Sequence, residues 1–272
     1  MLIITVIFSC NKVCGVYLMS YIVIESRGDR VKNNLLKKIF GLGVLLSVIA
    51  IPVKADSGFA IGVSGNVADF TTSGTEEEGY GAATSPQGIE STAGSAANSV
   101  EFGAIFAEFA GRNNWAGMTI GLEYIPGKAS LGSASRTDVA STTEDGATSD
   151  DSGTYTGKAE VSEHCTLYIE PTFYATEGIG IYAKGGLSNV KVTSLESISK
   201  GINSSAYGDV RIWGATLGAG LRFKHSSGFL IKTEYSHTEY EGITLTSTTG
   251  NQNRIKADPE SDNIRVAIGW QF

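Results

Sequence analysis

From residue 58 onward the sequence alternates apolar and polar side chains with a period of two. Such alternation is typical of β-strands whose two faces meet different surroundings, whereas an amphipathic helix repeats its apolar residues every three or four positions. The chain is therefore predicted to be all-β. Eight stretches carry the pattern: 58–70, 99–112, 115–125, 160–175, 179–192, 209–224, 228–240 and 262–272.

The connections between these stretches alternate between long and short. The long ones are 71–98, 126–159, 193–208 and 241–261, and the short ones are 113–114, 176–178 and 225–227. This order predicts an antiparallel up-and-down sheet with all long loops at one end and both termini at the other. Eight strands can close into a barrel that is either soluble or membrane-embedded. The residues on the two faces of the sheet distinguish these alternatives.

The short turns predict which residues face each other across the sheet. They pair Phe109 with Met118 and Leu221 with Ile231 on an apolar face. On the other face they pair Glu170 with Lys184. That second face carries four acids and four bases, predicted to form an ion-pair network: Glu108, Glu123, Glu170, Lys184, Arg222, Lys232, Glu234 and Arg265.

Three features indicate that the charged face lies inside and that lipid covers the apolar face. The charges on that face balance, although the chain has 28 acids against 21 bases. Glycines oppose large residues on the charged face, as in a narrow lumen. Aromatic residues mark both ends of the apolar face, about 25 Å apart for a tilted strand. The predicted membrane girdle comprises Tyr124, Trp213 and Tyr235 toward the long loops and Phe223, Phe229 and Trp270 toward the short turns.

The first 55 residues are predicted to be a leader that precedes a barrel domain over 56–272. Lys37 and Lys38 precede an apolar run over 39–51, and small residues end at Ala55, so a signal peptide is expected to be cleaved between Ala55 and Asp56. The run is shorter than the roughly 20 residues of a transmembrane helix. The unusual segment 1–30 suggests an over-long gene model, with translation starting at Met19 or Val31.

The last strand, Ile264-Arg265-Val266-Ala267-Ile268-Gly269-Trp270-Gln271-Phe272, alternates strictly and ends in an aromatic residue. With the signal peptide and eight strands, the chain resembles small bacterial outer-membrane barrels of the OmpA-transmembrane and OmpX-like class. The resemblance implies that Trp270 and Phe272 form the signal read by the barrel-assembly machinery. It also implies contact with outer-membrane lipid and lipopolysaccharide, extracellular loops and periplasmic termini. Because the chain ends at the last strand, we expect no peptidoglycan-binding domain after it.

The composition excludes several classes of function and site. The acidic barrel domain argues against a nucleic-acid partner, which would need clustered bases. No cofactor is expected, and the three histidines, His164, His225 and His237, are predicted to lie too far apart to share a metal. Cys165 is the single cysteine after the leader, which excludes a disulfide within the mature chain.

We therefore expect a structural or surface-interaction role, such as adhesion or antigenic display, with an extracellular partner at the four long loops. A narrow passive channel is the alternative. A lipid A-modifying enzyme comes third, on the spacing of His225 and Ser227. The acidic residues of the first two loops are interpreted as a solvated surface rather than a cation site; they are Glu76, Glu77, Glu78, Glu144, Asp145, Asp150 and Asp151.

Overall fold

The computed structural model describes residues 9–13, 16–20, 56–78, 90–138, 153–198, 207–247 and 254–272. Strands β1 (Ser9–Val13) and β2 (Val16–Ser20) form a two-stranded antiparallel sheet of their own. The predicted signal peptide over 39–51 and the residue before its cleavage site, Ala55, lie outside the described residues. No helix among the described residues is long and apolar enough to cross a membrane.

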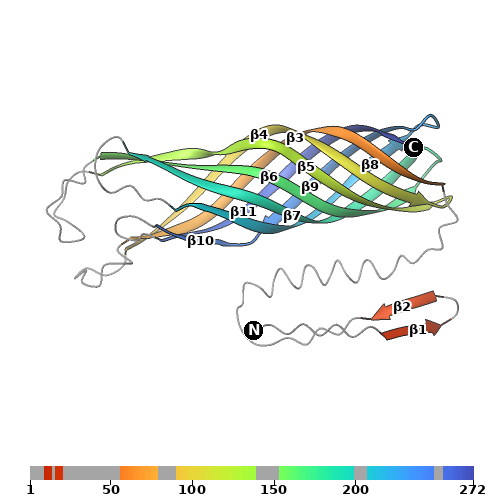
Figure 1. Ribbon diagram of the computed structural model, residues 1–272, viewed down its shortest axis with the longest axis horizontal. Helices are drawn as coiled ribbons and strands as arrows, with labels where there is room; N and C mark the ends of the chain where they lie inside the picture. The colour runs from red at the N-terminus through yellow and green to blue at the C-terminus, as the bar shows by residue number, and fades with distance from the viewer. Residues whose placement is uncertain are drawn as a thin grey trace.

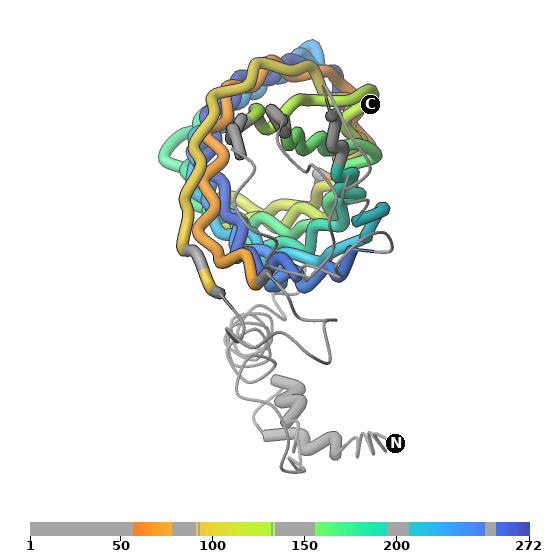
Figure 2. The backbone as a smooth tube through the Cα atoms, turned by 90° about the vertical axis from the view of Figure 1, so that its left-hand side faces the viewer, coloured from red at the N-terminus to blue at the C-terminus, as the bar shows by residue number. Residues whose placement is uncertain are grey.

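All other strands belong to one antiparallel sheet that closes on itself as a barrel. Figure 1 shows the barrel from the side, and Figure 2 shows it viewed down its axis. From β3 to β9 each strand pairs with the next along the chain, and the last strand, β11, pairs with both β9 and β3. A short strand, β10 (Ile243–Thr246), pairs with β11 beyond the end of β9. The eight staves of the barrel are β3 (Asp56–Glu78), β4 (Glu90–Arg112), β5 (Ala116–Asp138), β6 (Gly153–Tyr174), β7 (Ile179–Ile198), β8 (Asp209–Lys224), β9 (Phe229–Tyr240) and β11 (Arg254–Gln271).

The barrel has a turn end and a loop end. The three short connections and the C-terminus lie together at the turn end (Figure 1). There the backbone N–H of Phe272 donates to the carbonyl of Phe59 at 2.8 Å, so the first and last strands meet. This is the up-and-down topology predicted from the alternation of long and short connections.

The distribution of side chains is inverted relative to a water-soluble protein. The outer face carries exposed large hydrophobic residues on every stave, such as Ile61, Ile120 and Val266, while charged side chains are buried in the lumen. In the part of the barrel with this apolar outer face, the closed sheet has no free edge. A free edge in lipid would leave backbone N–H and C=O groups without hydrogen-bond partners. An apolar exterior around a polar interior in a closed antiparallel sheet is the architecture of a transmembrane β-barrel.

Two of the three predicted turn registers were wrong by two residues. Phe109 pairs with Ile120 rather than Met118, because the side chain of Asn113 accepts hydrogen bonds from the amides of Trp115 and Ala116 and moves the turn one residue along. Ile231 pairs with Phe223 rather than Leu221. A shift of two keeps every side chain on its face, so the predicted faces are unaffected.

The third register, across the turn at 176–178, is as predicted, with Phe173 opposite Ile181. At the turn after β8 the glycine explains the difference from prediction. Gly228 has φ +100°, a conformation that other residues rarely adopt, so the loop is centred one residue later than 225–227.

The staves extend much further toward the loop end than the alternation predicted. β3, β4 and β5 each have 23 residues, about twice the 9–11 needed to cross a membrane. The prediction of Glu76, Glu77 and Glu78 in a loop is therefore wrong, because all three belong to β3. The second set of acids, 144–151, lies outside the described residues.

The polarity of the two faces reverses in this extension. Inside it, five buried apolar residues form a cluster that we call the apolar cap: Val161, Val190, Val192, Ile212 and Ile243.

On the outside of the same strands, Lys191 binds Asp209 at 2.6 Å, and Arg211 binds Glu163. The hydrogen bond from Lys191 lowers the pKa of the Asp209 carboxyl. The barrel therefore leaves the membrane and continues as a water-exposed sheet with its own apolar core.

Candidate functional site

The eight charged residues predicted to line the lumen all lie there, and each is buried. In one half of this lumen network, Lys232 contacts both Glu108 and Glu170, at 2.6 Å in the case of Glu170. Arg222 lies 2.9 Å from Glu108 and 3.7 Å from Glu170. Tyr168 completes this half by donating its hydroxyl to Glu108 at 2.8 Å.

The other half of the lumen network holds the remaining four charges. Lys184 binds Glu234 at 2.8 Å, and the hydroxyl of Tyr182 donates to the same carboxylate at 3.0 Å. Arg265 meets Glu123 at 2.8 Å as an ion pair without hydrogen-bond geometry, and lies 3.6 Å from Glu234. Four acids and four bases thus neutralise one another where an unpaired charge would cost several kcal/mol.

The predicted ion pair between Glu170 and Lys184 is not formed. The two residues stand at facing positions of β6 and β7, as the register Ile169 to Gly185 shows, but each binds a partner across the lumen instead. Glu170 binds Lys232 of β9, and Lys184 binds Glu234 of the same strand. In a narrow barrel, strands that are distant in the sheet come within side-chain reach, so register alone does not give the partner.

Aromatic rings fill the space between the charges. The ring of Tyr168 occupies the position that a Cβ on Gly121 would take, and Tyr182 does the same at Gly220. Lys184 lies 4.4 Å from the centre of the Tyr168 ring, within cation–π range. The lumen at this height is a packed plug of rings and ion pairs.

The predicted girdle residues all face outward. Tyr124, Trp213 and Tyr235 stand toward the loop end of the apolar face, and Phe223, Phe229 and Trp270 stand next to the turn end. Phe272 follows β11 and is also exposed.

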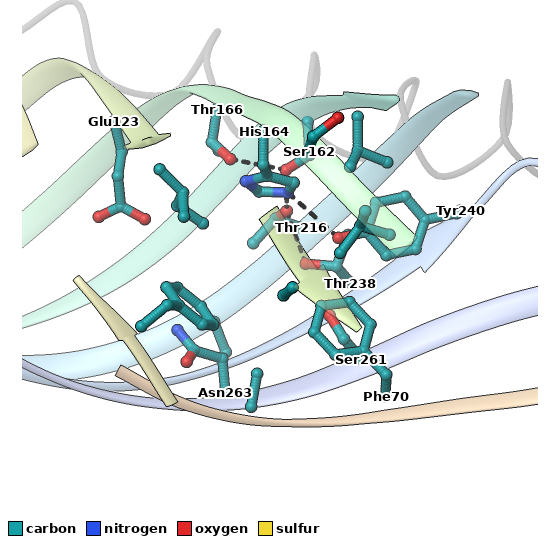
Figure 3. A pocket seen from close by; sticks show the side chains of 18 of the residues that line it. Phe70, Glu123, Ser162, His164, Thr166, Thr216, Thr238, Tyr240, Ser261 and Asn263 are labelled. Atoms are coloured by element: carbon teal, nitrogen blue, oxygen red, sulfur yellow. Dashed lines mark hydrogen bonds between the residues drawn. The ribbon is translucent and has the colours of Figure 1, made fainter. Parts of the chain in front are cut away.

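Between the lumen network and the apolar cap the structure contains a cavity of about 90 Å³ (Figure 3). One wall is a chain of hydroxyl groups from successive strands, in which Thr166, Ser188, Thr216 and Thr238 follow one another at 2.8, 2.8 and 2.9 Å. Apolar side chains, including Val161 and Val190 of the cap, line the side toward the loop end. Sequence reasoning missed this cavity, although its small hydroxyl residues share the inward phase of the charged ones.

His164 stands in the wall of the cavity with one ring nitrogen paired and one unpaired. Its Nε2 lies 3.1 Å from the hydroxyl of Tyr240 (Figure 3). Its Nδ1 is buried without a hydrogen-bond partner. On another wall, Asn263 donates its Nδ2 to Asn66 at 3.2 Å, while its Oδ1 is also buried without a partner.

The other two histidines lie elsewhere. His225 Nδ1 is 2.9 Å from the hydroxyl of Ser227 within the turn after β8, and neither residue bonds to a carboxylate among the described residues. His237 Nδ1 is 3.0 Å from Asp262 on the outer face. Within the described ranges, no group of three or more histidine, cysteine or acidic residues is arranged to hold a metal ion.

No family model matches the chain, and no curated protein matches it. Solved structures with a similar arrangement include the attachment invasion locus protein Ail of Yersinia pestis in complex with the heparin analogue sucrose octasulfate, at 15% identity over 78% of this chain and 99% of that chain, with TM-score 0.34. The outer membrane protease OmpT of Escherichia coli shares 11% identity over 83% and 100% of the two chains, with TM-score 0.43. OprG of Pseudomonas aeruginosa shares 13% over 79% and 96%, with TM-score 0.39.

Proposed function

We propose that the protein is a non-conducting barrel of the bacterial outer membrane whose loop end carries a surface-interaction role. The observation that carries this proposal is the combination of a plugged lumen with staves that continue, as a paired sheet, far beyond the outer girdle. A barrel that served only as an anchor would not need an extension with its own apolar cap. The extension holds the long connections clear of the lipid, where a partner can reach them.

In this proposal the turn end and both termini face the periplasm, and lipopolysaccharide surrounds the outer girdle. A signal peptide removed after Ala55 would deliver the chain to the barrel-assembly machinery, which would read Trp270 and Phe272. Orientation is tested with single cysteines in a Cys165→Ala background. Lys158→Cys at the loop end should react with a membrane-impermeant maleimide on intact cells, and Ser226→Cys at the turn end should react only after lysis. The reverse pattern would overturn the orientation.

The plugged lumen is tested by planar-bilayer conductance of the refolded chain over 56–272. A heat-dependent gel shift first shows that the barrel has folded. We expect no discrete current steps, because the lumen network and its rings leave no continuous aqueous path. Discrete single-channel steps from the folded barrel would refute the plug and favour the narrow passive channel.

The surface role is tested with variants that lack residues 79–89 or 139–152. Binding of cells that display the intact barrel or a variant would be measured on host-cell monolayers, with surface amounts matched by antibody. A loss of binding in either deletion supports the role. Equal binding by cells with and without the intact barrel contradicts it.

A further inference from the structure

The pairing between β4 and β5 stops partway along the two strands. From the turn it runs as far as Ile105 opposite Tyr124. Beyond that point, residues 90–104 of β4 pair only with β3, and the rest of β5 pairs only with β6. The barrel wall therefore has a seam between β4 and β5 that begins at the outer girdle residue Tyr124 and runs toward the loop end.

The sequence explains where the seam begins. Pro126 has no N–H to donate to β4. Gly127 follows with φ +96°, and the register of β5 against β6 shifts between Ile125 and Lys128, which is a β-bulge. A bulge bends its strand and disrupts the ladder, so β5 turns away from β4 at this height. Further out, a side-chain contact still bridges the seam, where Asn98 donates to the carbonyl of Ser130 at 2.9 Å.

The cavity opens toward this seam. Residues from both of its edges, Phe102 on β4 and Pro126 and Gly127 on β5, belong to the cavity lining, as do Glu101 and Lys128. The lumen network blocks the way toward the turn end, and the apolar cap covers the side toward the loop end. Among the described residues, the seam is therefore the route by which a molecule reaches the cavity.

The cavity wall offers hydrogen bonds that nothing in the protein uses. His164 Nδ1 and Asn263 Oδ1 are both buried and unpartnered, and both belong to residues that line the cavity from β6 and β11 (Figure 3). A buried polar atom without a partner destabilises the fold unless a bound molecule supplies the missing hydrogen bond. The two lumen charges that line the cavity are neutralised, because Lys184 binds Glu234 and Glu123 meets Arg265, so this wall favours an uncharged polar group. Oε2 of Glu123 also accepts no hydrogen bond.

We propose that the cavity binds the neutral hydroxyl head of an amphiphile from the outer leaflet, which enters sideways between β4 and β5. A hydroxyl can donate its proton to the Asn263 Oδ1 acceptor, and its first carbon then lies in the cavity that His164 also lines. About 90 Å³ is smaller than the cavity of roughly 150 Å³ that holds benzene, so only the head and the first carbons are enclosed. The tail leaves through the seam.

The outer surface beside the seam has room for that tail. Gly103 of β4 faces Gly65 of β3, and a Cβ at Gly65 would meet nothing within 4 Å. This shallow strip is bordered by apolar side chains, among them Val63 and Ile105, that already face the lipid. An alkyl chain leaving at the girdle passes directly into the apolar band.

The site is tested with carbon-13-labelled 1-decanol and the folded barrel in phosphatidylcholine nanodiscs. Histidine-selective labelling separates His164 from the other two histidines. We expect nuclear Overhauser contacts between the C1 protons of decanol and the His164 ring, and none from decane at the same lipid ratio. Asn263→Leu should weaken decanol binding about tenfold, the loss of one hydrogen bond. Absence of decanol contacts in the wild-type barrel would overturn the site.

The lateral route is tested by closing the seam in a Cys165→Ala background. Cysteines at Asn98 and Ser130 would be joined by oxidation, or by a short bifunctional thiol cross-linker if the disulfide does not form. The joined barrel should take up decanol at least tenfold more slowly, and reduction or omission of the cross-linker should restore the rate. Equal uptake by the joined and open forms would overturn entry through the seam, whatever the head group binds.

Discussion

Lys232 donates hydrogen bonds of 2.6 and 2.7 Å to the two carboxylate oxygens of Glu170, at a height where neither side chain touches solvent. The same ammonium also contacts Glu108. The three residues come from β9, β6 and β4, which are not neighbours in the sheet. One cation thus ties together three separate parts of the barrel wall.

Lys232→Met should lower the free energy of unfolding by about 3–5 kcal/mol, because it leaves two buried carboxylates facing Arg222 alone. The measurement is urea unfolding of the barrel folded in lipid vesicles, followed by the heat-dependent gel shift. Adding Glu170→Gln should recover part of the loss, since it removes one of the two acids. Lys128→Met is the matched control: its 3.9 Å pair with Glu160 is exposed, so the change should stay below about 1 kcal/mol. Equal losses in both single variants would contradict the role of the lumen network.

Gly121→Ala should destabilise the barrel by about 1–3 kcal/mol, because the new methyl group occupies the position of the Tyr168 ring. Gly65→Ala is the control, since its methyl group would enter open space on the outer face. It should change the free energy of unfolding by less than about 0.5 kcal/mol. The same urea titration measures the free energy of unfolding of both variants. Equal losses in the two variants would show that the Tyr168 ring is not packed tightly against Gly121.

Amide exchange should reveal the seam without any ligand. Backbone amides of residues 98–104 that point toward β5 should exchange at least tenfold faster than those of residues 106–110, which the β4–β5 ladder protects. Amides of the same segment that point toward β3 serve as the internal control, because that ladder is continuous. Mass-spectrometric or NMR exchange in nanodiscs gives the comparison. Uniform protection along β4 would mean that the wall is closed.

Phe272→Ala and Trp270→Ala should each reduce the amount of assembled barrel in cells severalfold, if the assembly machinery reads the terminal aromatics. Phe109→Ala, which removes a ring of exposure intermediate between those of Trp270 and Phe272 from the apolar face outside the last strand, should have a smaller effect. Refolding of the three purified variants into vesicles separates assembly from stability. A defect of the same size in vitro and in cells would assign the loss to stability alone.

The period-two pattern was enough to predict the staves, their antiparallel order and the face that each side chain takes. It succeeded because the membrane-crossing part of the barrel has sharply different surroundings on its two sides, as Ile181 outside and Lys184 inside illustrate. A register error of two residues left these faces intact. The positions of the turns depended on local features, the side chain of Asn113 and the backbone of Gly228, that alternation does not encode.

The extension was missed because its alternation has the opposite sense. Val190 and Val192 point inward while Lys191 points outward, so a search for apolar residues on the lipid face ends where the membrane ends. The ion-pair partners in the lumen network could not be predicted from the sequence either. Which base Glu170 meets depends on the diameter of the closed barrel, and the cavity beside His164 exists only once all eight staves surround it.

The hydrogen-bonded ladder between β11 and β3 joins residues as far apart in the chain as Ala60 and Gln271. The ring is therefore completed only by β11, the stave that is synthesised after the other seven. Until then β3 offers an open row of backbone donors and acceptors, beside side chains that water solvates poorly. Export must keep the unfinished chain apart from its own copies, and the time between the first strand and the last is when this protein is most exposed to aggregation.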